Sequence, residues 1–179
     1  PLLAIPRGST TGPDGALWFV VFNGVGRITT KGAVTRPYTD LESLHDVITN
    51  GPDGNFWLAD SSHSEIQRLT LAGVVTPFAG SNVEYPLGIT AGPDGAIWFT
   101  DPGYGIGNNY EGDKAEAELP MRVYRIDAAT GAAAVVAEDM QRPNGLAFSP
   151  DESRRSVAGS GAAALRVDDV AGGAQLSHG

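Results

Sequence analysis

The tetrapeptide Gly-Pro-Asp-Gly occurs three times in this chain, and no other feature of the sequence constrains its fold as strongly. Its proline stands at positions 13, 52 and 93, and an altered copy, Ser-Pro-Asp-Glu, places a fourth proline at position 150. The intervals between these prolines are 39, 41 and 57 residues. A unit of about 40 residues therefore repeats, and the last interval holds an insertion of about 16 residues.

A second marker keeps the same rhythm. An arginine followed by an aliphatic residue and then by Thr or Asp begins at Arg27, Arg68, Arg125 and Arg166, at intervals of 41, 57 and 41 residues. Two markers with one period indicate that the whole chain is built from one kind of unit.

Each unit reads as four short strands. Pro at the second and Gly at the fourth position of the tetrapeptide favour a type I turn, and the segments that follow it, 16–20, 55–59 and 96–100, are rich in aromatic and aliphatic residues. The three tryptophans share one repeat position, which we interpret as core between neighbouring units. We predict an all-β fold, a β-propeller of four-stranded blades in one domain over residues 1–179. The blade units are approximately 1–40, 41–80, 81–139 with a loop insertion at 102–120, and 140–179.

Charge and composition exclude several functions. The 21 acidic against 12 basic residues give a formal charge of −9, which disfavours nucleic acid and anionic membrane surfaces as partners. The chain has no cysteine, so thiolate catalysis and Cys-ligated metals are excluded. We expect no membrane contact. The sequence begins at Pro1, so the question of a signal peptide ahead of it stays open, and the cytoplasm is the favoured compartment.

The first strand of a propeller blade lines the central channel, and its start lies on the face of variable loops. Counting back six residues from each turn proline places Arg7, Asp46, Leu87 and Asn144 at one equivalent rim position. Carboxylate and amide oxygens suit Ca²⁺ or a similar hard cation, so Asn144, with Asp46 as a second candidate, could hold a metal. The alternative is an ion pair between Arg7 and Asp46, with Asn144 bonded to loop backbone.

Other polar residues lie near this rim. His45 precedes Asp46 and could act as a general base, whereas a solvent-facing or loop-bonded histidine is the alternative. His63 lies in a Ser-rich connection and is interpreted as a plain loop residue. The segment from Asp101 to Pro120 is either a lid over the channel mouth or a solvated acidic loop.

The last unit departs from the others, because Arg155 occupies the tryptophan position. We expect an arginine at this core position to pack poorly. Four blades in an open array would also leave strand edges and blade faces uncovered, which predicts self-association.

Several motifs resemble the gluconolactonase/regucalcin (senescence marker protein) family in the order of that family. They are the segments beginning with Trp98, Tyr110, Val123 and Arg142, which read WFTDPGYG, YEGDKAE, VYRID and RPNGLAFSPDES. The first 80 residues also resemble the repeats of streptogramin (virginiamycin B) lyase. The first resemblance implies a six-bladed propeller that hydrolyses sugar lactones or related esters with one divalent cation, Ca²⁺ in many members. Only about four of six blades are then expected in 179 residues.

The resemblance implies roles for particular residues. Asn144 matches the metal-ligand asparagine, and Asp101 and Tyr104 match a motif beside the site. Together with His45 and Arg7, which the repeat places at the rim, Asp101 and Tyr104 form the expected substrate pocket. Arg7 and Leu87 depart from the pattern, which has a glutamate ligand and a substrate-binding asparagine there. The catalytic aspartate is expected beyond Gly179.

The residues and the two resemblances together suggest three functions. The first is a metal-dependent hydrolase that takes a small lactone as substrate, whose isolated 179-residue chain is weak or inactive. The second is a streptogramin-type lyase, and the third is a non-catalytic propeller that serves as a binding module.

Overall fold

The computed structural model describes residues 5–39, 41, 45–78, 83, 85–103, 121–161 and 163–170. In this part of the chain the structure is all β. The strands, grouped by sheet, are β1 (Ser9–Thr11), β2 (Leu17–Val21), β3 (Gly24–Ile28) and β4 (Val34–Thr39); β5 (His45–Asn50), β6 (Phe56–Asp60), β7 (Glu65–Leu69) and β8 (Val75–Pro77); β9 (Ile89–Ala91), β10 (Ala96–Asp101), β11 (Arg122–Asp127) and β12 (Ala133–Ala137); and β13 (Pro143–Phe148), β14 (Arg154–Gly159) and β15 (Ala164–Asp169).

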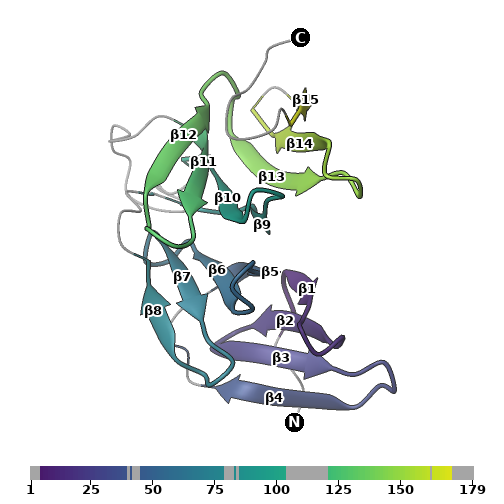
Figure 1. The fold of residues 1–179 in the computed structure, drawn as a ribbon. Coiled ribbons are helices and arrows are strands. Elements are labelled where there is room, and N and C mark those ends of the chain that lie inside the picture. The colour runs from purple at the N-terminus through teal and green to yellow at the C-terminus, as the bar shows by residue number, and fades with distance from the viewer. Residues whose placement is uncertain are drawn as a thin grey trace.

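Each sheet pairs its strands in sequence order and antiparallel, which is the topology of a propeller blade. The four blades follow one another along an arc (Figure 1). The first strand of each blade contacts the first strand of the next, β1 against β5, β5 against β9 and β9 against β13. These four strands therefore form the inner edge of the arc, as the sequence predicted. Among the described residues, no helix is long and apolar enough to cross a membrane.

The geometry of the turn explains why the tetrapeptide has glycine at its first and fourth positions. The turn closes by a bond from the fourth amide to the first carbonyl, Gly15 N to Gly12 O at 3.0 Å, and Gly15 has a φ of 71°. This left-handed conformation favours glycine because it has no Cβ. The first glycine makes room for tryptophan, because a Cβ on Gly12 would lie 2.2 Å from Trp18 Cδ1. The predicted turn is confirmed, and the same arrangement recurs in the second and third blades.

The aspartate of the turn binds the other two repeated residues. Asp14 accepts a hydrogen bond from Trp18 Nε1 at 2.8 Å and from Arg27 Nε at 2.6 Å. The corresponding groups are Asp53, Trp57 and Arg68 in the second blade and Asp94, Trp98 and Arg125 in the third. The two sequence markers are thus the two ends of one Asp–Trp–Arg cluster.

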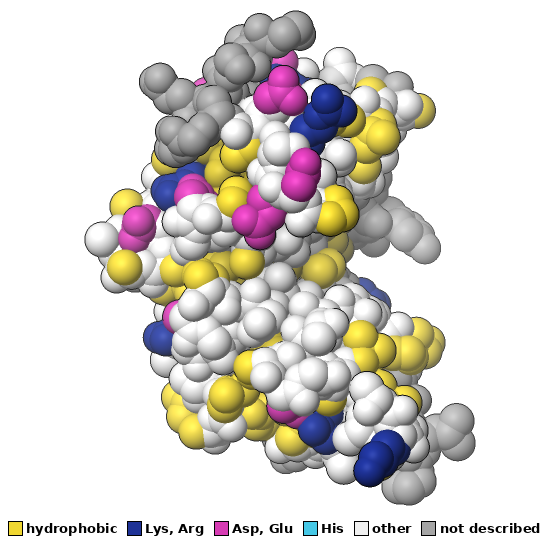
Figure 2. All heavy atoms as spheres, turned by 45° about the vertical axis from the view of Figure 1, so that its right-hand side comes forward, with side chains coloured by type: hydrophobic (Ala, Val, Ile, Leu, Met, Phe, Trp, Pro, Cys, Tyr) yellow, Lys and Arg dark blue, Asp and Glu magenta, His cyan; other side chains and the backbone are white. Residues whose placement is uncertain are grey.

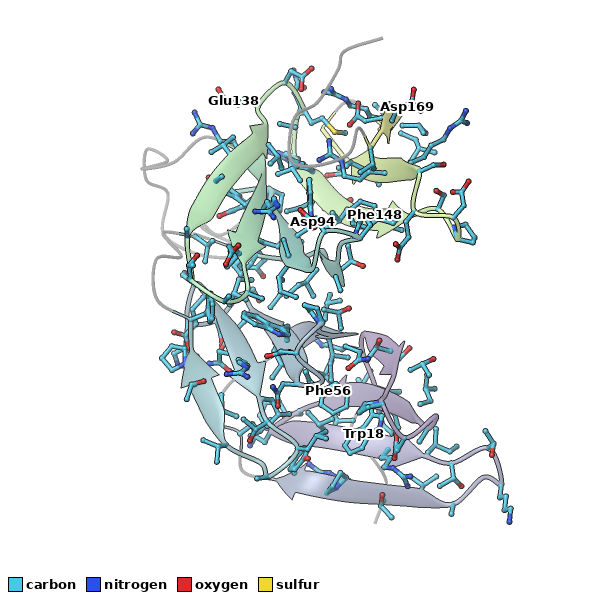
Figure 3. All side chains as sticks on the ribbon, viewed as in Figure 1. Trp18, Phe56, Asp94, Glu138, Phe148 and Asp169 are labelled. Atoms are coloured by element: carbon cyan, nitrogen blue, oxygen red, sulfur yellow. The ribbon has the colours of Figure 1, made fainter. Side chains whose placement is uncertain are left out.

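The aromatic side chains of the second strands fill the space between blades. Trp18 lies with its ring centroid 4.7 Å from that of Phe56, between the first two sheets (Figure 3). Trp98 meets Phe148 edge to face, with the ring centroids 5.5 Å apart. Trp57 is fully buried and belongs to the core cluster between the second and third sheets. The interpretation of the tryptophans as core between blades is confirmed.

The fourth blade has a different cluster, in which the arginine stands on the second strand and the aspartate on the third. Arg155 lies at the tryptophan position, and it pairs in register with Asp168, not with a marker arginine. Arg155 Nη2 donates to Asp168 Oδ2 at 2.6 Å, and its guanidinium lies 5.1 Å from the Trp98 ring centroid. Arg166 lies opposite Val157.

One expectation about this blade was therefore wrong. Arg155 does not pack poorly at its core position, since it is 1% exposed and both stacked and paired, although its Nε and Nη1 have no hydrogen-bond partner among the described residues. The Arg166 marker is displaced by two residues from the register of the other blades, because Asp168 takes the strand-three position opposite residue 155.

Candidate functional site

The rim position inferred from the repeat is defined by the backbone at the start of each first strand. Arg7 N donates to Val20 O at 2.9 Å, and Leu87 N donates to Thr100 O at 3.1 Å, which is the same bond in the first and third blades. In the second and fourth blades the pairing register shifts between His45 and Val47 and between Pro143 and Gly145. Asp46 and Asn144 thus each stand at a β-bulge.

A β-bulge redirects one side chain and interrupts the ladder, and bulges are common next to active sites. The two residues with oxygen donors occupy the bulged positions, whereas Arg7 and Leu87 occupy the regular ones. Because the first strands are neighbours along the inner edge, the structure places the four positions in succession around that edge. Arg7 is exposed, and Leu87 and Asn144 are half-buried.

The structure brings some of the expected site residues together and leaves others outside the described part. The side chains of His45 and Asp46 lie outside it, as does the whole of Tyr104, so the ion pair between Arg7 and Asp46 stays a prediction. Within the described side chains, no three His, Asp or Glu residues gather as metal ligands do.

Asp101 closes a loop beside the rim position of the third blade. It is the last residue of β10 and is 4% exposed, and its Oδ1 accepts hydrogen bonds from Tyr85 N at 3.2 Å and Gly103 N at 3.1 Å. Tyr85 lies just before the first strand of this blade, so the carboxylate ties the approach to β9 to the exit of β10. Asp101 thus holds the shape of the rim.

The second blade holds a group that the sequence interpretation missed. Asp60 ends β6 at the position equivalent to Asp101, three residues after the tryptophan, and its side chain is fully buried. Its Oδ2 lies 3.0 Å from Nδ1 of His63, a residue interpreted as a plain loop histidine. The spacing from tryptophan to aspartate, shared by Trp57–Asp60 and Trp98–Asp101, is the sequence signal that could have identified it.

Most ionisable groups with displaced pKa values lie on the turns, away from this edge. The bond from the Trp18 indole N–H lowers the pKa of Asp14 to about 2, with a further contribution from Arg27. Burial raises the pKa of Asp53 and Asp94, but hydrogen bonds from their tryptophan neighbours and from Asn55 or Arg125 outweigh it, so that both pKa values are lowered. These groups are structural.

Comparison with known proteins identifies relatives of two kinds. Residues 3–139 match the family model of the virginiamycin B lyase family. Over 122 residues, 65% of this chain, the sequence is 34% identical to the gluconolactonase of Zymomonas mobilis. The chain spans 34% of the length of that protein.

Solved structures show the same two kinds of relative. A gluconolactonase from Xanthomonas campestris superposes with a TM-score of 0.82 at 23% identity, over 98% of this chain and 61% of that one. The virginiamycin B lyase of Staphylococcus aureus, solved as a catalytically inactive variant with quinupristin, superposes with a TM-score of 0.68 at 26% identity, over 96% of this chain and 54% of that one. Both comparisons bear out the propeller fold.

Proposed function

This chain belongs to the virginiamycin B lyase family, and we propose that it serves the hydrolysis of sugar lactones or related esters. The observation that supports this proposal best is the position of Asn144, at a β-bulge of an innermost strand, in the sequence context that resembles gluconolactonases. The relationship to the Zymomonas gluconolactonase at 34% identity agrees with this substrate class.

A divalent cation, Ca²⁺ in the first instance, is part of this proposal. Asn144 would offer its amide oxygen and Asp46 a carboxylate oxygen, whereas Arg7 and Leu87 at the other two rim positions offer none. Calcium takes six to eight oxygen ligands. The described residues alone therefore do not complete a calcium site.

The rim residues can bind and orient a polar ligand. Asn144 has an amide that both donates and accepts hydrogen bonds, and the exposed Arg7 has a planar guanidinium that suits oxygen-rich groups. Asp101 fixes the loop beside them, as described above. Because Arg7 would repel a cation and the side chain of Leu87 has no hydrogen-bonding group, we propose that the chain by itself hydrolyses lactones weakly.

Hydrolysis of D-glucono-1,5-lactone with and without calcium tests the proposal. We expect weak, calcium-stimulated turnover that Asn144→Ala abolishes. Asn55→Ala is the matched control, since Asn55 lies beside a turn and bonds locally to Asp53. Turnover that Asn144→Ala leaves unchanged would contradict the role of Asn144, and the absence of both turnover and saturable calcium binding would favour the non-catalytic binding module.

A streptogramin-type lyase is the second candidate, and the match of residues 3–139 to the lyase family favours it. Loss of antibacterial activity of quinupristin after incubation with the chain would support the lyase, because a hydrolase of sugar lactones is not expected to inactivate it. Mass spectrometry of the product separates the two, since hydrolysis adds the mass of water and elimination does not.

A further inference from the structure

The carboxylate of Asp60 is held by one loop through both of its oxygens. Oδ1 accepts hydrogen bonds from Ser62 N at 3.0 Å, Ser62 Oγ at 2.7 Å and His63 N at 3.1 Å. Oδ2 faces His63 Nδ1 at 3.0 Å and accepts from Gln67 Nε2 at 3.1 Å. The loop between β6 and β7 is thus wrapped around a fully buried carboxylate.

Comparison with Asp101, the equivalent aspartate of the third blade, distinguishes the hydrogen bonds that close the loop from the contact with the histidine. Asp101 accepts the backbone amides of Tyr85 and Gly103 through Oδ1. In the second blade Oδ1 alone likewise accepts from two backbone amides, those of Ser62 and His63, so the contact of Oδ2 with Nδ1 of the imidazole is additional to loop closure. A carboxylate that binds an imidazole in this way fixes its tautomer and orientation.

The tautomer follows from the chemistry of the contact. An ionised carboxylate only accepts hydrogen bonds, so Nδ1 of His63 carries the proton and the neutral ring keeps its lone pair on Nε2. The His63 side chain is 53% exposed. Nε2 therefore presents a proton acceptor to solvent, while Nδ1 is also 3.3 Å from Ser62 Oγ.

The pair lies beside the rim position of the second blade. Asp60 is the register partner of His45, which directly precedes the bulged residue Asp46 at the start of the innermost strand of this blade. Glu65 also lies beside the pair, since it accepts a hydrogen bond from Gln67, and the strand of His45 pairs with the strand of Asp60.

We propose that Asp60 and His63 form a proton-accepting pair, and that His63 Nε2 receives a proton from a hydroxyl group brought to this edge. Its use in hydrolysis rests on the proposed lactonase function. There, His63 Nε2 takes one proton of the attacking water while the water oxygen bonds to the lactone carbonyl carbon, whose π electrons move to its oxygen. The ester C–O bond then breaks as the carbonyl re-forms, and the leaving alkoxide takes the proton from Nε2.

Nitrogen-15 NMR of the labelled chain tests the pair without any need for activity. We expect His63 at pH 8 to be protonated at Nδ1, and titration with D-gluconate to shift Nε2 saturably. A tautomer protonated at Nε2 would overturn the pair, and an Nε2 signal that gluconate leaves unmoved would overturn its contact with hydroxyl ligands. Both measurements use the unaltered sequence, so they do not depend on the folding of a variant.

Kinetics test the use of the pair in hydrolysis. We expect His63→Gln to lower kcat/KM for gluconolactone on the order of 100-fold and to remove the acid limb of the pH profile. Ser160→Ala, in the corresponding loop of the fourth blade, should leave both unchanged. If His63→Gln keeps the acid limb, the hydrolytic role is overturned. If the unaltered chain hydrolyses no lactone at any pH, the proposed function fails and this role with it, whereas the NMR result alone decides the pair.

Discussion

At the scale of single residues, the fourth turn shows what the repeated tetrapeptide achieves. Glu152 stands where the other three turns have glycine, it donates the same closing bond to Ser149 O at 2.8 Å, and its φ is 58°. A side chain with a Cβ is strained in this left-handed region by about 1 kcal/mol. The turn therefore forms in the fourth blade at a cost that the other three avoid.

Glu152→Gly should raise the free energy of unfolding by about 0.5–1 kcal/mol, because glycine removes this strain. The reverse change, Gly15→Ala, should lower it by about 1 kcal/mol for the same reason. A Cβ at Gly15 meets no atom within 4 Å, so steric clash does not contribute. Urea denaturation followed by tryptophan fluorescence measures both, and a less stable Glu152→Gly variant would refute the assignment of strain.

At the scale of elements, β14 and β15 depend on a buried ion pair. Asp168 is 8% exposed and binds Arg155 Nη2 and Arg166 Nε, each at 2.6 Å. Burial raises the pKa of Asp168, but the hydrogen bonds from the two arginines lower it below the ordinary value. Arg166 also pairs with Asp139, so the network links β15 to the end of the third blade.

Asp168→Asn should lower the free energy of unfolding by about 3 kcal/mol, because it leaves the buried Arg155 guanidinium without its counter-charge. The adjacent Asp169→Asn is the matched control. Its side chain is 78% exposed and lies 3.5 Å from Arg154, so the change should stay within about 0.5 kcal/mol. Equal effects of the two variants in thermal denaturation would show that the buried pair does not stabilise the blade.

At the scale of the whole molecule, charge and apolar surface are distributed unevenly. Lys and Arg side chains are dispersed over the face in Figure 2, whereas several acidic side chains gather over its upper half. Leu165 and Val167 on β15 are 70% and 52% exposed. Self-association through this strand stays a prediction, since exposed apolar strand edges pair readily.

Acid should unfold the molecule through its turn aspartates. The pKa of Asp14 in the folded chain is lowered to about 2 by the Trp18 indole bond, and those of Asp53 and Asp94 are lowered as well. A lowered folded pKa contributes stability that is present above the unfolded value of about 3.9 and is lost as the pH falls through the folded pKa.

We therefore expect the free energy of unfolding to fall steadily from about pH 5 to pH 2, and to fall less steeply in Asp14→Asn. Urea denaturation at a series of pH values measures this slope. Identical slopes for the two proteins would contradict the role of Asp14, and Asp127→Asn would then test whether another surface aspartate is responsible, since its pKa is also lowered, chiefly by the backbone amide of Thr130.

Much of the fold could be predicted because each repeated residue has a local conformational or packing role. Turn proline, left-handed glycine and tryptophan spacing are local requirements, so they identify the turns, the second strands and the core between blades. The register of β15 could not be predicted in this way. Arg166 keeps the rhythm of the marker, but the pairing is decided by which charged group can reach the buried Arg155.

The candidate site was predictable only in part. The rim position followed from counting within the repeat, because equivalent residues of equivalent blades share an edge. The contact between Asp60 and His63 could not be derived, since it depends on the path of the loop between β6 and β7 and on the left-handed Ser64, whose φ is 56°.

By itself, therefore, the sequence determined the blade architecture and the residues offered at the inner edge, because both depend on a local period of about 40 residues. Only the tertiary structure decided which charges are buried together. The pairing of Arg155 with Asp168 and of Asp60 with His63 needs distances between side chains that no repeat encodes. A carboxylate excluded from water is stable only with donors around it, and the fold alone supplies them.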